Sequence, residues 1–91
     1  MTLTDLYTTI CQRRDQANPN SYTAQLIEKG EDEIVKKVGE EAIEVILAAK
    51  SQGNHRLVEE LSDLAYHVLV LMAYRNLTPA DVEAELDKRR R

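Results

Sequence analysis

The sequence contains no tryptophan or phenylalanine, and only four of its 91 residues are tyrosine. The core must therefore be aliphatic with some tyrosine, and hydrophobic residues supply 43% of the chain. A chain of this length is enough for one small domain, so we expect residues 1–91 to form a single domain whose core alone is only modestly stabilising. Self-association would stabilise such a domain further, and we expect it.

Cysteine and histidine are also scarce, with one Cys and two His. Cys11 has no second cysteine for an internal disulfide, and so few ligands exclude the usual zinc frameworks. A lone cysteine that acts as a small buried apolar side chain fits a reducing cytoplasm. No apolar run approaches the roughly 20 residues that span a bilayer, and none at the N-terminus has signal-peptide form. We expect a cytoplasmic protein with no membrane partner.

Basic residues are outnumbered by acidic ones, 12 against 16, which gives a formal net charge of −4. A general nucleic-acid-binding protein normally presents a basic face, so we expect no nucleic-acid partner. An acidic protein that handles an anionic ligand needs a cation as intermediary or a locally basic pocket.

The hydrophobic spacing predicts an all-α bundle of about five helices, without a strand pattern or an internal repeat. We expect helices at residues 3–14, 21–30, 32–50, 54–75 and from Thr78 onward. The stop and start signals are Gly30 as a left-handed cap, Asn76 as a cap, and the Thr78-Pro79 pair at a helix start. The helix at 32–50 is apolar over more than half of its circumference, which favours a bundle completed by dimerisation.

The two long helices each carry a group of acids. Side chains three or four residues apart share one side of a helix, so Glu41 points with Glu44, and Glu60 points with Asp63. If the helices pack antiparallel, these four carboxylates converge, with Glu40 beside them, and form the oxygen site that Mg²⁺ prefers. The alternative is a solvated acidic face, which is common on helices. Glu60 and Asp63 lie at the edge of an apolar stripe, and this placement favours a site.

Lys36 and Lys37 precede the first acids by one turn and could reach the phosphates of a substrate. The alternative is simple i,i+4 pairing of Lys36 with Glu40 and of Lys37 with Glu41. Carboxylates, a divalent cation and lysines together suit water attack on a phosphoanhydride, with Glu40 as general base. His67, one turn beyond Asp63, fits a hydrogen-bonded core or interface residue better than a substrate contact.

Three runs of the sequence resemble phosphoribosyl-ATP pyrophosphohydrolase. They are S-Y-T-A at 21–24, K-K-V-G-E-E-A at 36–42 and E-L-S-D-L-A-Y-H at 60–67. The resemblance extends over about residues 3–87. It implies an all-α, MazG-like enzyme that uses Mg²⁺ and forms a homodimer or a higher homo-oligomer. The implied reaction is the second step of histidine biosynthesis, in which 1-(5-phosphoribosyl)-ATP is cleaved to 1-(5-phosphoribosyl)-AMP and pyrophosphate.

The resemblance also implies roles for individual residues. The metal ligands would be Glu41, Glu44, Glu60 and Asp63, with Glu40 adjacent. The substrate pocket would include Ser21, Tyr22 and Thr23 together with Lys36 and Lys37. Helix capping by Ser21 or Thr23 would explain those two residues equally well.

Two other functions remain open at the level of the sequence. The same acids would serve a housecleaning pyrophosphohydrolase that acts on ordinary or damaged nucleoside triphosphates. A non-enzymatic helical dimerisation module would carry them as a solvated surface.

Overall fold

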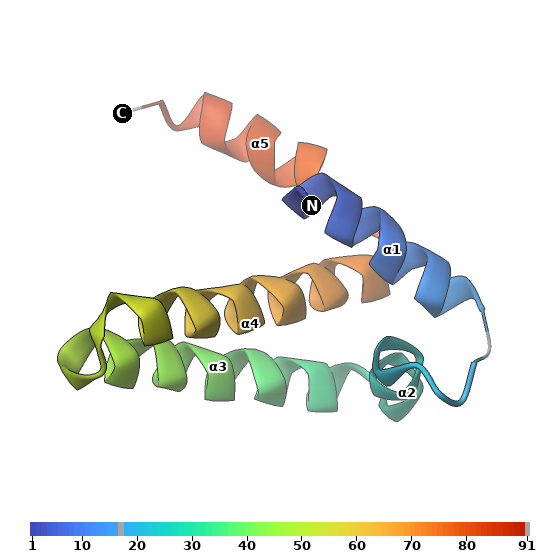
Figure 1. Ribbon diagram of the computed structural model, residues 1–91. Helices are drawn as coiled ribbons and strands as arrows, with labels where there is room; N and C mark the ends of the chain where they lie inside the picture. The colour runs from blue at the N-terminus through green and yellow to red at the C-terminus, as the bar shows by residue number, and fades with distance from the viewer. Residues whose placement is uncertain (17, 91) are drawn as a thin grey trace.

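A computed structural model describes residues 1–16 and 18–90 and confirms the predicted all-α fold (Figure 1). The described residues form five helices. They are α1 (Leu3–Asp15), α2 (Tyr22–Lys29), α3 (Glu31–Ser51), α4 (Gly53–Tyr74) and α5 (Pro79–Lys88). The predicted bounds agree with these to within one or two residues, which is the precision with which helix ends are defined.

Side-chain caps define the start of the first and last helices. The hydroxyl of Thr2 accepts from the backbone N–H of Asp5, and the carboxylate of Asp5 accepts from the N–H of Thr2. Thr78 and Asp81 form the same reciprocal pair, with Pro79 at the first helical position. These caps satisfy backbone donors that a helix start otherwise leaves unpaired, and they confirm the predicted start of α5.

Gly30 ends α2 and directly precedes α3. Its φ of +100° is positive, but its ψ of 176° is extended, so the predicted left-handed cap conformation was wrong, although Gly30 does end the helix. Side chains other than hydrogen are strongly disfavoured in that conformation, so glycine permits the abrupt turn between the two helices. The N–H of Gly30 donates to the carbonyl of Ile27 at 3.1 Å and closes the last turn of α2.

The long helices α3 and α4 form an antiparallel hairpin and lie side by side along their length (Figure 1). Gly53, with φ of +81°, begins α4 directly after the turn and allows the chain to reverse within a few residues. The acids of the two helices are thereby brought to the same level of the hairpin.

The core lies at the end of this hairpin where α1 and α2 pack against it. Tyr66, Tyr7 and Cys11 pack half-buried against it, so the prediction of an aliphatic core with some tyrosine is confirmed. Arg14 of α1 donates to the carbonyl of Ala73 at 2.7 Å and holds α1 against the end of α4. The buried members are Ile10, Leu26, Ile34, Leu69, Val70, Met72 and Ala73.

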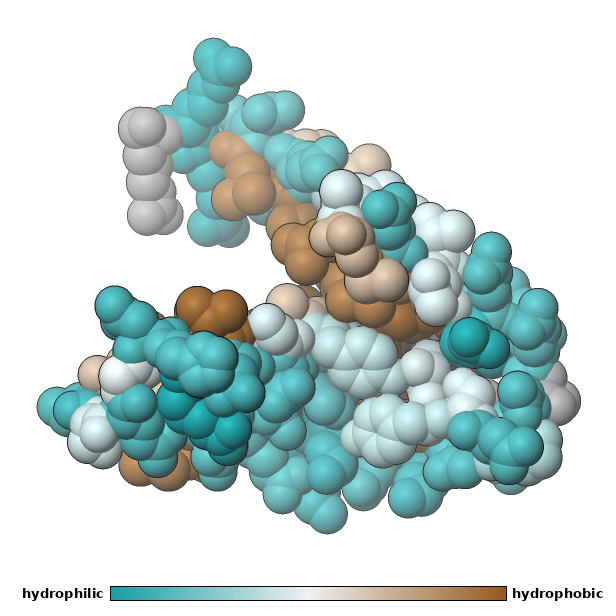
Figure 2. Space-filling view, viewed as in Figure 1, coloured by the Kyte–Doolittle hydropathy of each residue, from teal (hydrophilic) through white to brown (hydrophobic). Residues whose placement is uncertain are grey.

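The other end of the hairpin and α5 carry exposed apolar side chains (Figure 2). None of the residues of α5, all of which are described, is buried. The hydroxyl of Tyr7 in α1 donates to the carbonyl of Leu77, just before α5 begins. Among the described helices, none combines the length and the apolar character that crossing a membrane requires.

Truncating a side chain in the core tests this assignment. Ile34 is 0% exposed, so Ile34→Ala removes buried methyl groups and leaves a cavity, which costs about 2–5 kcal/mol of unfolding free energy. Leu3→Ala is the control, because Leu3 is 63% exposed and its truncation costs no more than about 0.5 kcal/mol. Urea denaturation measures both. Equal costs for the two variants would contradict the position of Ile34 in the core.

Candidate metal and phosphate site

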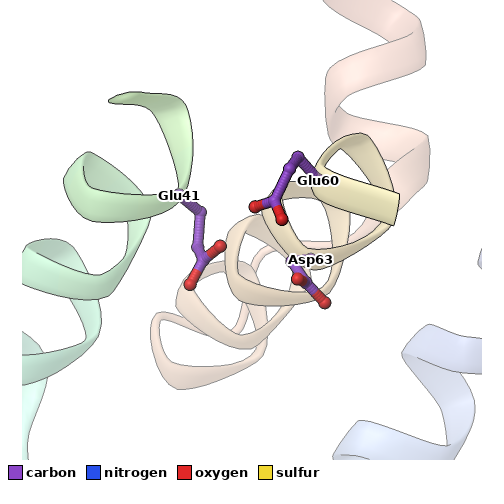
Figure 3. Close-up of side chains that lie close together, drawn as sticks. All are labelled: Glu41, Glu60 and Asp63. Atoms are coloured by element: carbon purple, nitrogen blue, oxygen red, sulfur yellow. The ribbon is translucent and has the colours of Figure 1, made fainter. Parts of the chain in front are cut away.

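Three carboxylates meet between the long helices, Glu41 from α3 and Glu60 and Asp63 from α4 (Figure 3). One oxygen from each lies within 4.8 Å of the others. Opposite ligands of one Mg²⁺ are about 4.2 Å apart, so small side-chain movements would place all three oxygens around one ion. The predicted convergence of the two acid groups is thus present for these three residues.

The three acids differ in their access to solvent. Glu60 is only 3% exposed, Glu41 is half-buried and Asp63 is exposed. The cluster is therefore closed on the side of Glu60 and open on the side of Asp63. A buried carboxylate needs a cation or hydrogen-bond donors to offset its lost hydration.

Arg56 supplies that compensation from the first turn of α4. Its Nη2 lies 2.7 Å from Oε1 of Glu60, and its Nη1 lies 3.3 Å from Oε1 of Glu59. The hydrogen bond to Glu59 and the negative charge of Glu60 raise the pKa of Arg56. The sequence analysis missed this residue, although its i,i+4 spacing to Glu60 is the signal that could have found it.

Glu40 and Glu44 lie outside the three-acid group but line the same open cavity of about 340 Å³. Glu40 is exposed, and Glu44 is half-buried. The remaining lining residues are Lys37, Glu41, Arg56, Glu60 and Asp63. All five predicted acids therefore border one cavity, and two cations border it with them.

The two lysines have different surroundings. Lys37 lines the cavity, and its Nζ lies 3.8 Å from an oxygen of Glu40. Lys36 is directed to Glu33, also at 3.8 Å. Both pairs span three residues, so the suggested i,i+4 pairs of Lys36 with Glu40 and of Lys37 with Glu41 were wrong in register. A lysine can reach either the third or the fourth residue along a helix, and the sequence does not distinguish them.

An imidazole connects α2 to the turn of α4 that carries Asp63. Nδ1 of His67 lies 2.8 Å from the backbone carbonyl of Asp63, and Nε2 lies 3.2 Å from the hydroxyl of Tyr22. A carbonyl only accepts, so Nδ1 carries a proton, and in the neutral imidazole Nε2 then accepts from the hydroxyl of Tyr22. His67 is 7% exposed, which confirms the prediction of a hydrogen-bonded core residue.

The segment at 21–23 has one exposed side chain between two structural ones. Ser21 is the N-cap of α2 and accepts from the N–H of Ala24 at 3.2 Å. Thr23 is buried and is hydrogen-bonded to the hydroxyl of Tyr66. Tyr22 is 50% exposed. Of the two residues for which helix capping was the alternative to substrate binding, Ser21 is the one that caps α2.

The phenol of Tyr22 lies within electrostatic range of three acids of α3. Partial burial raises the pKa of Tyr22, and the negative charge of Glu41 raises it further, followed by Glu33 and Glu40. The Tyr22 ring lies in an aromatic cluster with Tyr66 and His67. The exposed part of Tyr22 thus lies on α2 within electrostatic range of Glu41, outside the lining of the acidic cavity.

Comparison with known proteins matches residues 3–90 to the family described as phosphoribosyl-ATP pyrophosphohydrolase. A phosphoribosyl-ATP pyrophosphatase of Pelotomaculum thermopropionicum is 56% identical over 86 residues, which cover 94% of this chain and 88% of the relative. One from Listeria welshimeri is 52% identical, with 96% and 84% covered. One from Saccharolobus solfataricus is 41% identical, with 96% and 93% covered.

Alkaline titration tests the position of Tyr22. Because its folded-state pKa is raised, the neutral phenol favours the folded state below about pH 10, and this contribution is lost as the pH rises through the folded-state pKa. Glu41→Gln removes a negative charge and should lower the pKa of Tyr22, while the effect of burial remains. Phenolate absorbance in wild type, Glu41→Gln and Tyr22→Phe isolates this group.

Glu28→Gln serves as the matched control, because Glu28 is an exposed acid on α2 that does not shift Tyr22. Identical Tyr22 titrations in Glu41→Gln and Glu28→Gln would contradict the placement of the phenol beside the acid cluster.

Proposed function

The chain belongs to the phosphoribosyl-ATP pyrophosphohydrolase family of histidine biosynthesis, and we propose that it cleaves the α–β phosphoanhydride of 1-(5-phosphoribosyl)-ATP with a Mg²⁺ ion held between α3 and α4. The products would be 1-(5-phosphoribosyl)-AMP and pyrophosphate. The observation that carries this proposal is the meeting of Glu41, Glu60 and Asp63 at one point of the hairpin. The family is the one that the sequence runs resembled.

The donor set fits a hard divalent cation. All three converging groups are carboxylates, and the cavity lining contains neither histidine nor cysteine among the described residues. Mg²⁺ prefers such oxygen ligands and leaves several positions for water and substrate phosphates. Glu41, Glu60 and Asp63 would hold the ion, and Glu44 would join from the cavity wall. When bound, the ion would neutralise charge on the polyphosphate and favour ionisation of the attacking water.

Glu40 is our candidate for the general base. It lies on the cavity wall one residue before Glu41, and its side chain is 50% exposed, so water can reach it. A general base must lie within hydrogen-bond distance of the proton that it removes, and a carboxylate not bound to metal can take that position. Lys37, now beside Glu40, would turn to a phosphate oxygen of the substrate and leave Glu40 free to accept.

Substrate contacts divide between exposed and supporting residues. Tyr22 offers a partly exposed ring on which a nucleotide base or ribose can pack. Ser21 and Thr23 would act on the substrate through Tyr22, since one caps α2 and the other is fixed to Tyr66. Lys36 would contribute to the positive potential at greater range, from its position beside Glu33.

We further propose that the chain functions as a homodimer or a larger homo-oligomer. The hairpin exposes apolar side chains at helical spacing on both α3 and α4, a continuous pattern that in soluble proteins marks an interface. On α3 they are Val35, Ile43, Ile46 and Leu47, and on α4 they are Val58, Leu61 and Val68. A second copy with the same stripe would bury both.

Substrate choice and metal dependence are tested together by pyrophosphate release. We expect Mg²⁺-dependent release from phosphoribosyl-ATP that exceeds release from dATP. Asp63→Asn should reduce it by more than about a hundredfold, because changing even a residue that only orients a metal ligand costs about 10- to 100-fold. Asp32→Asn, the same substitution at an exposed acid of α3, is the control.

Two results would contradict this proposal. Pyrophosphate release from dATP but not from phosphoribosyl-ATP would agree with the metal site but show that the substrate is a different nucleotide. No pyrophosphate release from either compound by the folded protein would indicate that the acids are only a solvated surface.

Sedimentation equilibrium tests self-association. The wild-type chain should sediment at two or more times its mass of 10.4 kDa. Ile46→Glu should shift it to the monomer, because Ile46 is 59% exposed on the apolar stripe and a buried unpaired charge is costly. Gln12→Glu on the exposed surface of α1 is the control. A monomeric wild-type protein would refute the proposed oligomer.

A further inference from the structure

The guanidinium of Arg56 lies against the most buried acid of the cluster. Its Nη2 is 2.7 Å from Oε1 of Glu60, whose side chain is 4% exposed, whereas the side chain of Arg56 is 50% exposed. The pair therefore joins a fixed carboxylate to a cation that solvent can reach. Among the described residues of α4, Arg56 is the cation that pairs with Glu60.

This contact competes with a metal ion. Glu60 belongs to the three-acid group, so its carboxylate would turn toward the ion and share or lose the hydrogen bond to Arg56. The two cations would also repel each other. At a separation of about 6 Å, repulsion between a guanidinium and a divalent ion weakens metal binding about tenfold even at the dielectric constant of water.

The released guanidinium would remain within reach of the substrate. Phosphate oxygens bound to the same ion lie about 2.1 Å from it, as do the oxygens of Glu60, so they fall close to the donors of Arg56. A guanidinium can donate two parallel hydrogen bonds to a phosphate group, a geometry that lysine lacks. Lys37 borders the cavity from α3 and Arg56 from α4, so positive charge would approach the polyphosphate from both helices.

Resting on the proposed function, we propose that Arg56 is a phosphate-binding residue that neutralises Glu60 until the metal and the substrate enter. Arg56 would then exchange a carboxylate partner for a phosphate partner, with no change in its charge. The exchange keeps the buried acid compensated in both states, first by the guanidinium and then by the ion.

Two measurements on the same variants test this exchange. The first is the rise of the thermal unfolding midpoint over a series of MgCl₂ concentrations without substrate, which gives the affinity for the metal alone. The second is KM for phosphoribosyl-ATP at saturating Mg²⁺. The variants are Arg56→Gln and Arg56→Lys, with Arg89→Gln as matched control, since Arg89 forms an i,i+4 pair with Glu85 on α5, away from the cavity.

Arg56→Gln should bind Mg²⁺ about tenfold more tightly and show a KM at least about tenfold higher, because it loses both the repulsion and the phosphate contact. Arg56→Lys keeps the charge and the folded pair, so its metal affinity should stay within about twofold of wild type while its KM rises. Arg89→Gln should change neither quantity.

A KM for Arg56→Gln within twofold of wild type would overturn the phosphate contact, and unchanged or weaker Mg²⁺ binding would overturn the competition. Both outcomes differ from failure of the proposed function, in which the wild-type chain itself shows no stabilisation by Mg²⁺ or no pyrophosphate release.

Discussion

Repulsion between like charges at the middle of the hairpin is the constraint on which the rest of this structure depends. Packing of α3 against α4 brings oxygens of Glu41, Glu60 and Asp63 within 4.8 Å of one another. Negative charges so close repel one another unless a cation lies near them. The free energy that holds them together comes from the apolar core at the end of the hairpin where α1 and α2 pack, and where Ile34 and Val70 are fully buried. The stabilising apolar contacts thus lie away from the acid cluster, and they offset the repulsion within it.

The helices and most of the acids could be predicted from the sequence because their signals are local. Helical spacing, the Thr78-Pro79 start and the glycine at position 30 each act within a few residues. The pairing of Glu41 with Glu60 and Asp63 needed only the further assumption that neighbouring long helices pack antiparallel. The reaction itself was inferred from the family resemblance, because the helical spacing of apolar residues carries no information about a substrate.

The details that the sequence did not predict depend on three-dimensional choices among near-equal local partners. Lysines three and four residues from an acid can both pair with it, and the structure alone shows that Lys37 meets Glu40. The role of Arg56 depends on the burial of its i,i+4 partner Glu60, which the packing of α4 determines and the spacing alone does not. The separation of Ser21, Tyr22 and Thr23 into a cap, an exposed ring and a buried hydroxyl likewise follows from how α2 packs.

The imidazole of His67 has a consequence for which residues this position tolerates. One ring nitrogen donates to the carbonyl of Asp63, the other accepts from Tyr22, and the side chain is almost wholly buried. A replacement must donate at one end, accept at the other and fill the same flat space between α2 and α4. Asparagine is too short, an aliphatic residue satisfies neither partner, and a lysine, arginine or carboxylate satisfies at most one of them and buries a charge. The partners on α2 and on α4 thus both limit which residues position 67 accepts, although its side chain lies outside the acidic cavity.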